Sequence, residues 1–192
     1  MCSARPLDMS LYHTIGKLGP RVVDKPTLFK WGFNLSPMYR RSTARIVDVS
    51  DDLHRVSLRL PISYKNKNYV GAIFGGSLFS AVDPIPMVQL INILDNRYIV
   101  WDRSAEVVFR APARQDVVAE SVYTADEVRQ TVEAVEANGE TDITRTLRLT
   151  DASGETTFCV VTKTLYVATK AHHRAKRERR AEARRQVTAS AG

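Results

Sequence analysis

The sequence predicts an α+β protein in which one mostly antiparallel sheet wraps around a long, central, apolar helix. Segments with the pattern of strands dominate the chain of 192 residues. The apolar residues between positions 75 and 94 have helical spacing and would cover more than one face of a helix. Such a helix has to be deeply buried. The most economical way to bury both the helix and one face of the sheet is to wrap the sheet around the helix.

Short helices are expected before the sheet. Four apolar residues between positions 7 and 18 recur at spacings of three or four, which predicts an amphipathic helix that ends at Gly19-Pro20. A second short segment follows Asp24 and offers aromatic side chains for packing. We therefore expect residues 1–42 to form an N-terminal helical segment.

The first two strands are predicted at residues 43–49 and 54–60, joined as a hairpin across Asp51-Asp52. In the second strand, apolar side chains alternate with polar ones, which is the pattern of a half-buried strand. The later elements are a long strand over residues 98–109, a strand at 117–123, a peripheral helix at 125–137 stopped by Asn138-Gly139, and strands at 141–150 and 156–167. Residues 43–168 are predicted to form one domain.

The positive charge of the chain is concentrated in its C-terminal tail. Residues 170–185 contain eight of the 28 basic residues and two of the 21 acidic residues, so they supply six of the seven net positive charges. We predict that residues 169–192 form a basic, flexible tail that is helical or becomes so. It lacks aromatic side chains for base stacking and an apolar face for membrane insertion. A solvated appendage is the simplest interpretation, while weak binding to nucleic acid, to an anionic surface or to coenzyme A phosphates stays open.

Several classes of protein are excluded by composition. Cys2 and Cys159 cannot build a disulfide framework or a thiolate zinc site, and the four histidines lack metal-ligand spacing, so we expect no metal. No apolar run approaches the ~20 residues of a membrane helix, and no signal peptide is recognisable. We expect a cytoplasmic protein without a membrane span.

Residues 68–83, NYVGAIFGGSLFSAVD, contain the clearest motif of the chain. The pattern Asn68-x-x-Gly71-x-x-Phe74-Gly75-Gly76, followed by Asp83, resembles the hotdog-fold acyl-coenzyme A thioesterases of the phenylacetate-pathway type. The resemblance extends over most of residues 43–167 and is closest to a branch of that superfamily defined as a domain of unknown function.

The resemblance implies a hotdog fold, assembled at least as a homodimer, that hydrolyses an acyl-coenzyme A-like thioester without a cofactor. Elementary chemistry supports the same roles, because the first turn of a helix offers unpaired N–H groups and a partial positive charge. Gly75 and Gly76 would stabilise the oxyanion, Asp83 would act as general base or nucleophile, and Asn68 would assist.

Each of these residues also has a simpler interpretation. Phe74 replaces the histidine of the family, which favours an alternative in which the protein binds an acyl-coenzyme A or fatty acyl chain without turnover. Asp83 precedes Pro84, so the helix should be kinked or split there. Asp83 could then serve simply as the N-cap of the second half of the helix, without a role in catalysis. The glycine pair could serve close packing, and Asn68 could cap its own loop.

Further residues are candidates for binding the substrate. Phe74 is a candidate for contacting the acyl group. Phe79, with Met87 and Leu90, could line an acyl tunnel or could equally belong to the core. Asp102 and Ser104 lie on the strand after the central helix, where they could reach Asp83 of a neighbouring protomer, or could be surface residues.

Overall fold

One six-stranded antiparallel sheet dominates the structure, a computed structural model that describes residues 24–190. The order across the sheet is β1-β2-β4-β5-β6-β3. The strands are β1 (Arg45–Val49), β2 (Arg55–Leu60), β3 (Tyr98–Phe109), β4 (Val117–Val122), β5 (Glu140–Thr150) and β6 (Thr157–Thr169). Their bounds agree with the predicted strands to within a few residues.

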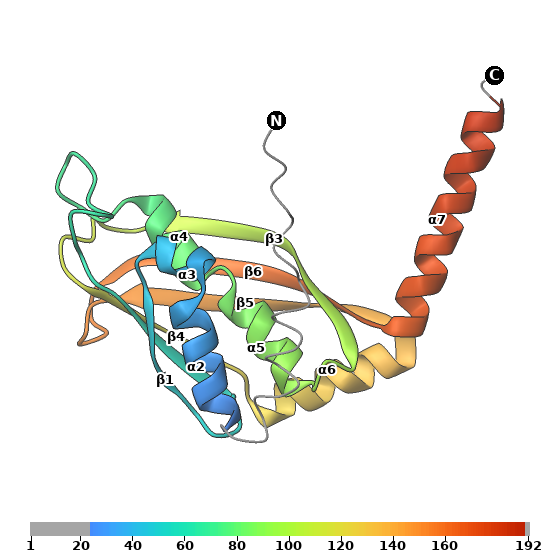
Figure 1. Ribbon diagram of the computed structural model, residues 1–192, viewed down its shortest axis with the longest axis horizontal. Helices are drawn as coiled ribbons and strands as arrows, with labels where there is room; N and C mark the ends of the chain where they lie inside the picture. Colours follow the sequence, from blue (N-terminus) through green and yellow to red (C-terminus); the bar gives the residue numbers. More distant parts are fainter. Residues whose placement is uncertain (1–23, 191–192) are drawn as a thin grey trace, which may run out of the picture.

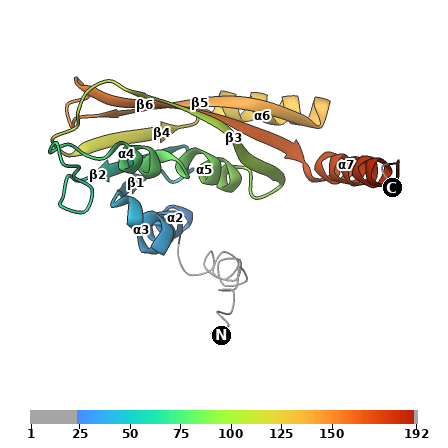
Figure 2. The ribbon, with the colours of Figure 1, turned by 90° about the horizontal axis from the view of Figure 1, so that it is seen from above.

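Helices pack against the sheet and at its ends. They are α2 (Lys25–Leu35), α3 (Pro37–Ser42), α4 (Gly75–Val82), α5 (Ile85–Ile93), α6 (Ala125–Asn138) and α7 (Lys170–Ser190). The sheet curves around α4 and α5, which lie on the same face, as Figures 1 and 2 show. This is the predicted α+β arrangement. The helix predicted over residues 7–18 lies outside the described residues.

The core is formed by the inward-facing residues of the strands and the apolar helices above them. One cluster, which includes Leu58, Val82 and Val161, lies under α4. A second cluster, which includes Leu90, Tyr123 and Leu165, lies under α5 and extends to α6. Alternation along β2 and β6 therefore buries one face of the sheet, which we call the inner face, and leaves the outer face to other contacts.

The central helix is broken between Val82 and Ile85, so the prediction of a split near Asp83 is confirmed. Pro84 and Pro86 lack an N–H group, and the helical hydrogen bonds that these residues would donate cannot form. The apolar rod thus consists of two short helices in line rather than one continuous helix.

Side chains from other elements donate hydrogen bonds to the backbone carbonyls around this break. Tyr39 Oη donates to the Ala81 carbonyl at 3.0 Å, and Tyr123 Oη donates to the Pro86 carbonyl at 3.0 Å. Lys163 Nζ donates to the carbonyl of Asp83. Burial raises the pKa of both tyrosines, so they remain neutral donors.

The two edges of the sheet differ. At the β1 edge, the Asn34 side chain of α2 pairs with both backbone groups of Ile46, at 2.9 Å each, and covers the strand. At the opposite edge, β3 has no strand beyond it in the described part of the chain. A long, open edge strand is a surface to which another strand can pair.

The predicted long strand is confirmed as β3, with one irregularity. Its register against β6 shifts between Asp102 and Ser104. Asp102 lies opposite Leu165, which faces inward, whereas Ser104 lies opposite Thr164 on the outer face. This β-bulge therefore places the two residues on opposite faces, although their spacing alone predicts the same face.

The predicted helical tail is confirmed as α7, which follows β6 directly. Its start is anchored by an ion pair between Lys176 and Glu140 of β5. The helix projects past the β3 edge of the sheet (Figure 1). Among residues 24–190, no helix is long and apolar enough to cross a membrane.

We expect Tyr39→Phe to destabilise the fold by about 1–3 kcal/mol, because the Ala81 carbonyl at the helix break loses its buried donor. Urea unfolding, followed by circular dichroism, measures the change. Tyr64→Phe, at an exposed loop position, is the matched control and should unfold like the wild type. Equal stability of the two variants would show that this hydrogen bond contributes nothing.

Candidate active site

A buried lysine joins two aspartates at the break in the central helix. Lys163 Nζ lies 2.6 Å from Asp83 Oδ1 and 2.8 Å from Asp102 Oδ2. The Lys163 side chain is 0% exposed, whereas the side chains of Asp83 and Asp102 are 41% and 31% exposed. We call these three residues the lysine–aspartate cluster.

Three separate elements bring the cluster together. Asp83 is the residue at which α4 ends, so its carboxylate lies where the helix is interrupted. Lys163 occupies an inward-facing position of β6, between Val161 and Leu165, and Asp102 faces inward from the edge strand β3. The cluster therefore lies between the helix break and the open edge of the sheet.

Burial of an ammonium group is unfavourable unless every donor has a partner. Lys163 meets this requirement with three acceptors, namely Asp83 Oδ1, Asp102 Oδ2 and the backbone carbonyl of Asp83. An ammonium has three N–H donors, so its capacity is fully used. The cluster holds Asp83 by its side chain and its backbone together, which leaves the carboxylate little freedom.

Asp83 does not cap the second half of the helix. The N-cap position of α5 is occupied by Pro84, and no side chain bonds to the α5 amides there. The Asp83 carboxylate instead accepts from Lys163. The capping alternative is therefore wrong, and the carboxylate is partly exposed beside a cation.

The glycine pair forms the first turn of α4, with Phe74 at the N-cap position. Ser77 N donates back to the Phe74 carbonyl, while no acceptor in the described chain is recorded for the amides of Gly75 and Gly76. A Cβ atom added at Gly75 would lie 2.8 Å from the Phe109 ring, and one added at Gly76 would overlap the Phe74 ring. Two aromatic rings thus lie against the amide end of the helix.

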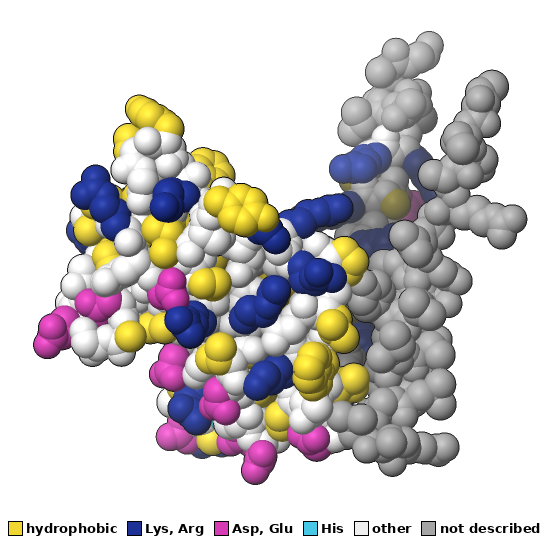
Figure 3. All heavy atoms as spheres, turned by 60° about the vertical axis from the view of Figure 1, so that its left-hand side comes forward, with side chains coloured by type: hydrophobic (Ala, Val, Ile, Leu, Met, Phe, Trp, Pro, Cys, Tyr) yellow, Lys and Arg dark blue, Asp and Glu magenta, His cyan; other side chains and the backbone are white. Residues whose placement is uncertain are grey.

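Both of these rings are largely exposed, Phe74 by 59% and Phe109 by 57%. They belong to an end of the molecule where other hydrophobic side chains, including Tyr69 and Val70, are also exposed. Figure 3 shows hydrophobic and basic side chains interspersed over this side of the surface. Phe79, one of the residues that could line a tunnel or belong to the core, packs against the core cluster under α4.

Asn68 organises the loop that leads into α4. Its side-chain oxygen accepts hydrogen bonds from the backbone amides of Val70 and Ala72. Its backbone N–H donates to the Ala72 carbonyl at 2.8 Å. The neighbouring Asn66 anchors the same loop, because its backbone carbonyl accepts a hydrogen bond from the backbone N–H of Phe74. This geometry matches the alternative in which Asn68 caps its own turn.

The structure thus brings Asp83 and Asp102 together in one chain, with Lys163, which the sequence analysis missed. Ser104 lies on the other face of the sheet and apart from them. The amide end of α4 is also separate from Asp83, because seven helical residues correspond to about 10 Å along the axis. Among the described residues, no group of three or more His, Cys, Asp and Glu side chains could hold a metal ion.

Comparison with solved structures identifies the fold as the hotdog fold. Protein PA5026 of Pseudomonas aeruginosa, of unknown function and described as a "probable thioesterase", superposes with a TM-score of 0.66 at 23% identity over 74% of this chain and 95% of its own. OLEI01261 of Chlorobaculum tepidum, of unknown function, gives 0.62 at 18% identity over 75% and 94%. A mutant form of the thioesterase PA1618 of Pseudomonas aeruginosa gives 0.53 at 12% identity over 71% and 88%.

Residues 26–167 match the family described as Domain of unknown function (DUF4442). The chain therefore belongs to the DUF4442 family. No curated protein matches the sequence. The match begins at the second residue of α2, so nearly all of α2 and the whole of α3 lie inside the matched region.

We expect Lys163→Met to lower the free energy of unfolding by about 1–3 kcal/mol, because the two aspartates lose the cation between them. The further change Asp102→Asn should be less damaging in the Lys163→Met protein than in the wild type, since it then removes repulsion between carboxylates. Urea titrations of the four proteins give the coupling energy, expected to be about 1 kcal/mol or more. Lys67→Met, at an exposed loop position, is the control, and additivity within error would show that the cluster does not act as a unit.

Proposed function

We propose that this protein hydrolyses thioesters of the acyl-coenzyme A type, without a metal or an organic cofactor. The observation that carries the proposal is the position of Asp83. Its carboxylate is partly exposed at the break of a hydrophobic helix, and Lys163 holds it through one oxygen only, Oδ1. The fold shared with proteins described as thioesterases agrees with this chemistry.

In the proposed reaction, Asp83 Oδ2 removes a proton from a water molecule while Oδ1 remains bonded to Lys163. The water oxygen attacks the thioester carbonyl carbon, and the carbonyl oxygen becomes an oxyanion. Amides at the start of α4 donate hydrogen bonds to this oxyanion, a contribution worth about 3 kcal/mol per donor in other enzymes. The carbon–sulfur bond then breaks, and the thiolate takes the proton from Asp83, which gives a carboxylic acid and a free thiol.

A single chain cannot supply both catalytic elements to one carbonyl group. The general base and the oxyanion donors each have to lie about 3 Å from neighbouring atoms of the same reacting group. Gly76 and Asp83 of one chain are separated by about 10 Å along the helix. We therefore propose that the site contains Asp83 of one protomer and Gly75 and Gly76 of its partner in a homodimer.

The open edge of β3 suggests how the two protomers pair. The amide end of α4 lies beside Phe109, and Asp83 lies beside Asp102 of the same strand. Antiparallel pairing of two β3 strands, centred near Ala105 and Glu106, would place Phe109 of each protomer opposite Asp102 of the other. Such pairing also satisfies the free backbone groups of a 12-residue edge strand.

Phe74 and Phe79 would contact the acyl group in this arrangement, and Asn68 would act indirectly by holding the loop before α4. Ser104 faces away, so we assign it no contact with the thioester. We propose the same division of the chain as the sequence suggests, with an N-terminal helical segment (1–42), the hotdog domain (43–168) and a basic tail (169–192).

One observation favours the alternative of a non-catalytic acyl-binding protein. The Phe74 ring lies against Gly76, close to the amides that would hold the proposed oxyanion. A phenyl ring cannot hydrogen-bond to a carbonyl group, so Phe74 cannot take the place of the family's histidine. A panel of short, medium and long acyl-coenzyme A compounds separates the two functions, because only the enzyme releases a free thiol.

Asp83→Asn should lower thiol release at least about 100-fold, since the general base is lost. Asparagine keeps a side-chain oxygen that can accept from Lys163, so the fold should remain intact by circular dichroism. Asp51→Asn, at an exposed turn, is the matched control and should retain full activity. Unchanged turnover in Asp83→Asn would refute the assigned role, and binding of acyl-coenzyme A without turnover in the wild type would establish the alternative.

A mixture of two inactive variants tests the shared site. Gly76→Val should block the amide end of α4, and Asp83→Asn removes the base. In a mixed dimer, one of the two sites carries both defects and the other carries neither. Random mixing of co-expressed chains should therefore restore about a quarter of the wild-type activity. If the mixture is no more active than its parents, the two residues do not come from different protomers.

A further inference from the structure

Two adjoining hollows lie between α7 and the outer face of the sheet, with volumes of about 910 Å³ and 300 Å³. Both are lined by His173, Arg177 and Arg180 of α7. The larger one also borders Ile99, and the smaller one borders Trp101 and Tyr166. We call the two together the α7 groove.

The floor of the α7 groove is aromatic. The Trp101 ring of β3 stacks on the Tyr166 ring of β6, with centroids 4.7 Å apart and planes at 19°, and His173 contacts Trp101 edge-on at 5.0 Å. Trp101 is 39% exposed. These rings lie on the outer face, because Trp101 and Tyr166 pair with each other next to the inward-facing Leu165. The sheet thus supplies the aromatic surface that the tail sequence lacks.

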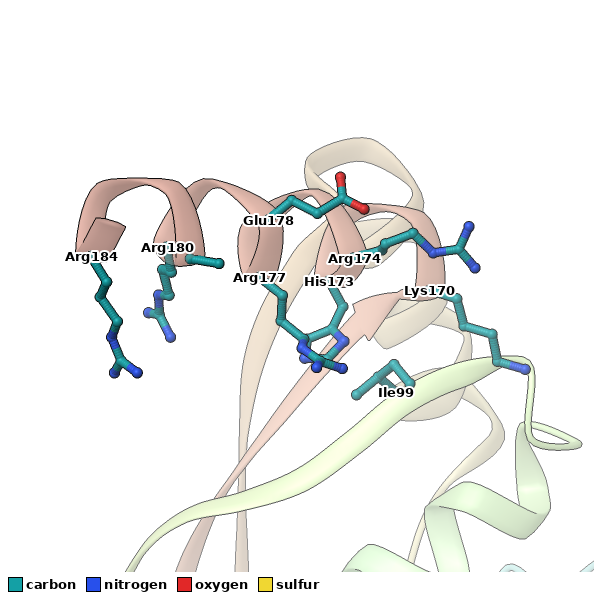
Figure 4. A pocket seen from close by; sticks show the side chains of 9 residues that line it. Ile99, Lys170, His173, Arg174, Arg177, Glu178, Arg180 and Arg184 are labelled. Atoms are coloured by element: carbon teal, nitrogen blue, oxygen red, sulfur yellow. The ribbon is translucent and has the colours of Figure 1, made fainter. Parts of the chain in front are cut away.

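The wall of the groove is basic. His173, Arg177, Arg180 and Arg184 project from the same side of α7 in Figure 4. Glu178 also lines the larger hollow, but its side chain points away from these four. Their spacings of four, three and four residues place them on one helical face, over a length of about 16 Å.

Part of the positive charge in the groove is not neutralised by the protein. Lys176 is paired with Glu140, whose pKa falls to about 2 because of its hydrogen bonds from Lys176 and Tyr166. Arg103, above the Tyr166 ring, is paired with Asp142. Arg177 and Arg180, by contrast, form no ion pair with another residue in the described part of the chain.

We propose that the α7 groove binds a short stretch of single-stranded nucleic acid. The arginine row would contact successive phosphates, and an unstacked base would lie on Trp101. A basic row beside an aromatic platform is the combination by which single strands are bound without a sequence requirement. A duplex keeps its bases stacked and could use only the charges. A membrane surface would need an apolar helix face, which α7 does not have.

This binding is separate from thioester hydrolysis. The α7 groove lies on the outer face of the sheet, and the lysine–aspartate cluster lies on the inner face, although Trp101 and Asp102 are consecutive residues. Failure of either proposal therefore leaves the other intact, and Asp83→Asn protein should bind nucleic acid as the wild type does.

The test measures binding of the full chain to a fluorescein-labelled oligothymidine of about 12 nucleotides, by anisotropy over a range of salt concentrations. The double variant Arg177→Gln/Arg180→Gln should reduce the slope of log K against log salt by about 1.4, which is the loss of two phosphate contacts. The matched control, Arg179→Gln/Arg185→Gln, removes the same charge from the other sides of α7 and should alter binding much less.

Trp101→Ala should weaken binding roughly tenfold without changing the salt slope, because stacking is not an ionic contact. In a Trp31→Phe background, where Trp101 is the remaining tryptophan, binding should quench the intrinsic fluorescence. This readout does not depend on any change at Trp101 itself.

Three results would each overturn the proposal. The first is equal loss of binding in the groove variant and the control variant. The second is unaltered affinity of Trp101→Ala together with equally tight binding of a duplex or of inorganic polyphosphate, which would show attraction by charge alone. The third is binding to phosphatidylserine vesicles but not to the oligonucleotide, which would assign α7 to a membrane surface.

Discussion

The ammonium group of Lys163 is the contact on which the geometry of the inner face depends. It bonds to the side chain of Asp83, the carbonyl of Asp83 and the side chain of Asp102, and it thereby ties the helix break to β6 and β3. Two prolines make the break unavoidable, but they do not fix its position relative to the sheet. The buried cation does so, because two acceptors on Asp83 and one on Asp102 of β3 have to meet at one nitrogen on β6.

Much of the fold could be predicted from the sequence because it depends on local periodicity. Alternation predicted β2, the two prolines predicted the helix break, and Asn138-Gly139 predicted the end of α6. A signal for Lys163 was also present. In the alternating pattern of β6, Cys159, Val161, Leu165 and Val167 face inward, and a lysine at position 163 falls in the same row. Its partner could not be predicted, because Asp83 is 80 positions away in the sequence.

The remaining differences arise where one residue changes the direction of its neighbours. The β-bulge in β3 places Asp102 and Ser104 on opposite faces of the sheet. Neither side chain gives a sequence signal for an extra residue at that point. The tail shows the same limitation. Its sequence contains no aromatic residue, and only the pairing of β3 with β6 brings Trp101 and Tyr166 beside its arginines.

The strand β3 therefore contributes to three different parts of the structure. Its inner face contributes Asp102 to a buried ion pair, its outer face contributes Trp101 to a basic groove, and its edge carries unpaired backbone groups. An ordinary edge strand is protected by being short or covered, as β1 is by Asn34. β3 is the second-longest strand in the described sheet and is left open at its edge. Such an edge is stable in solution when it is paired, and pairing is also what would bring the amide end of one central helix to the aspartate of another.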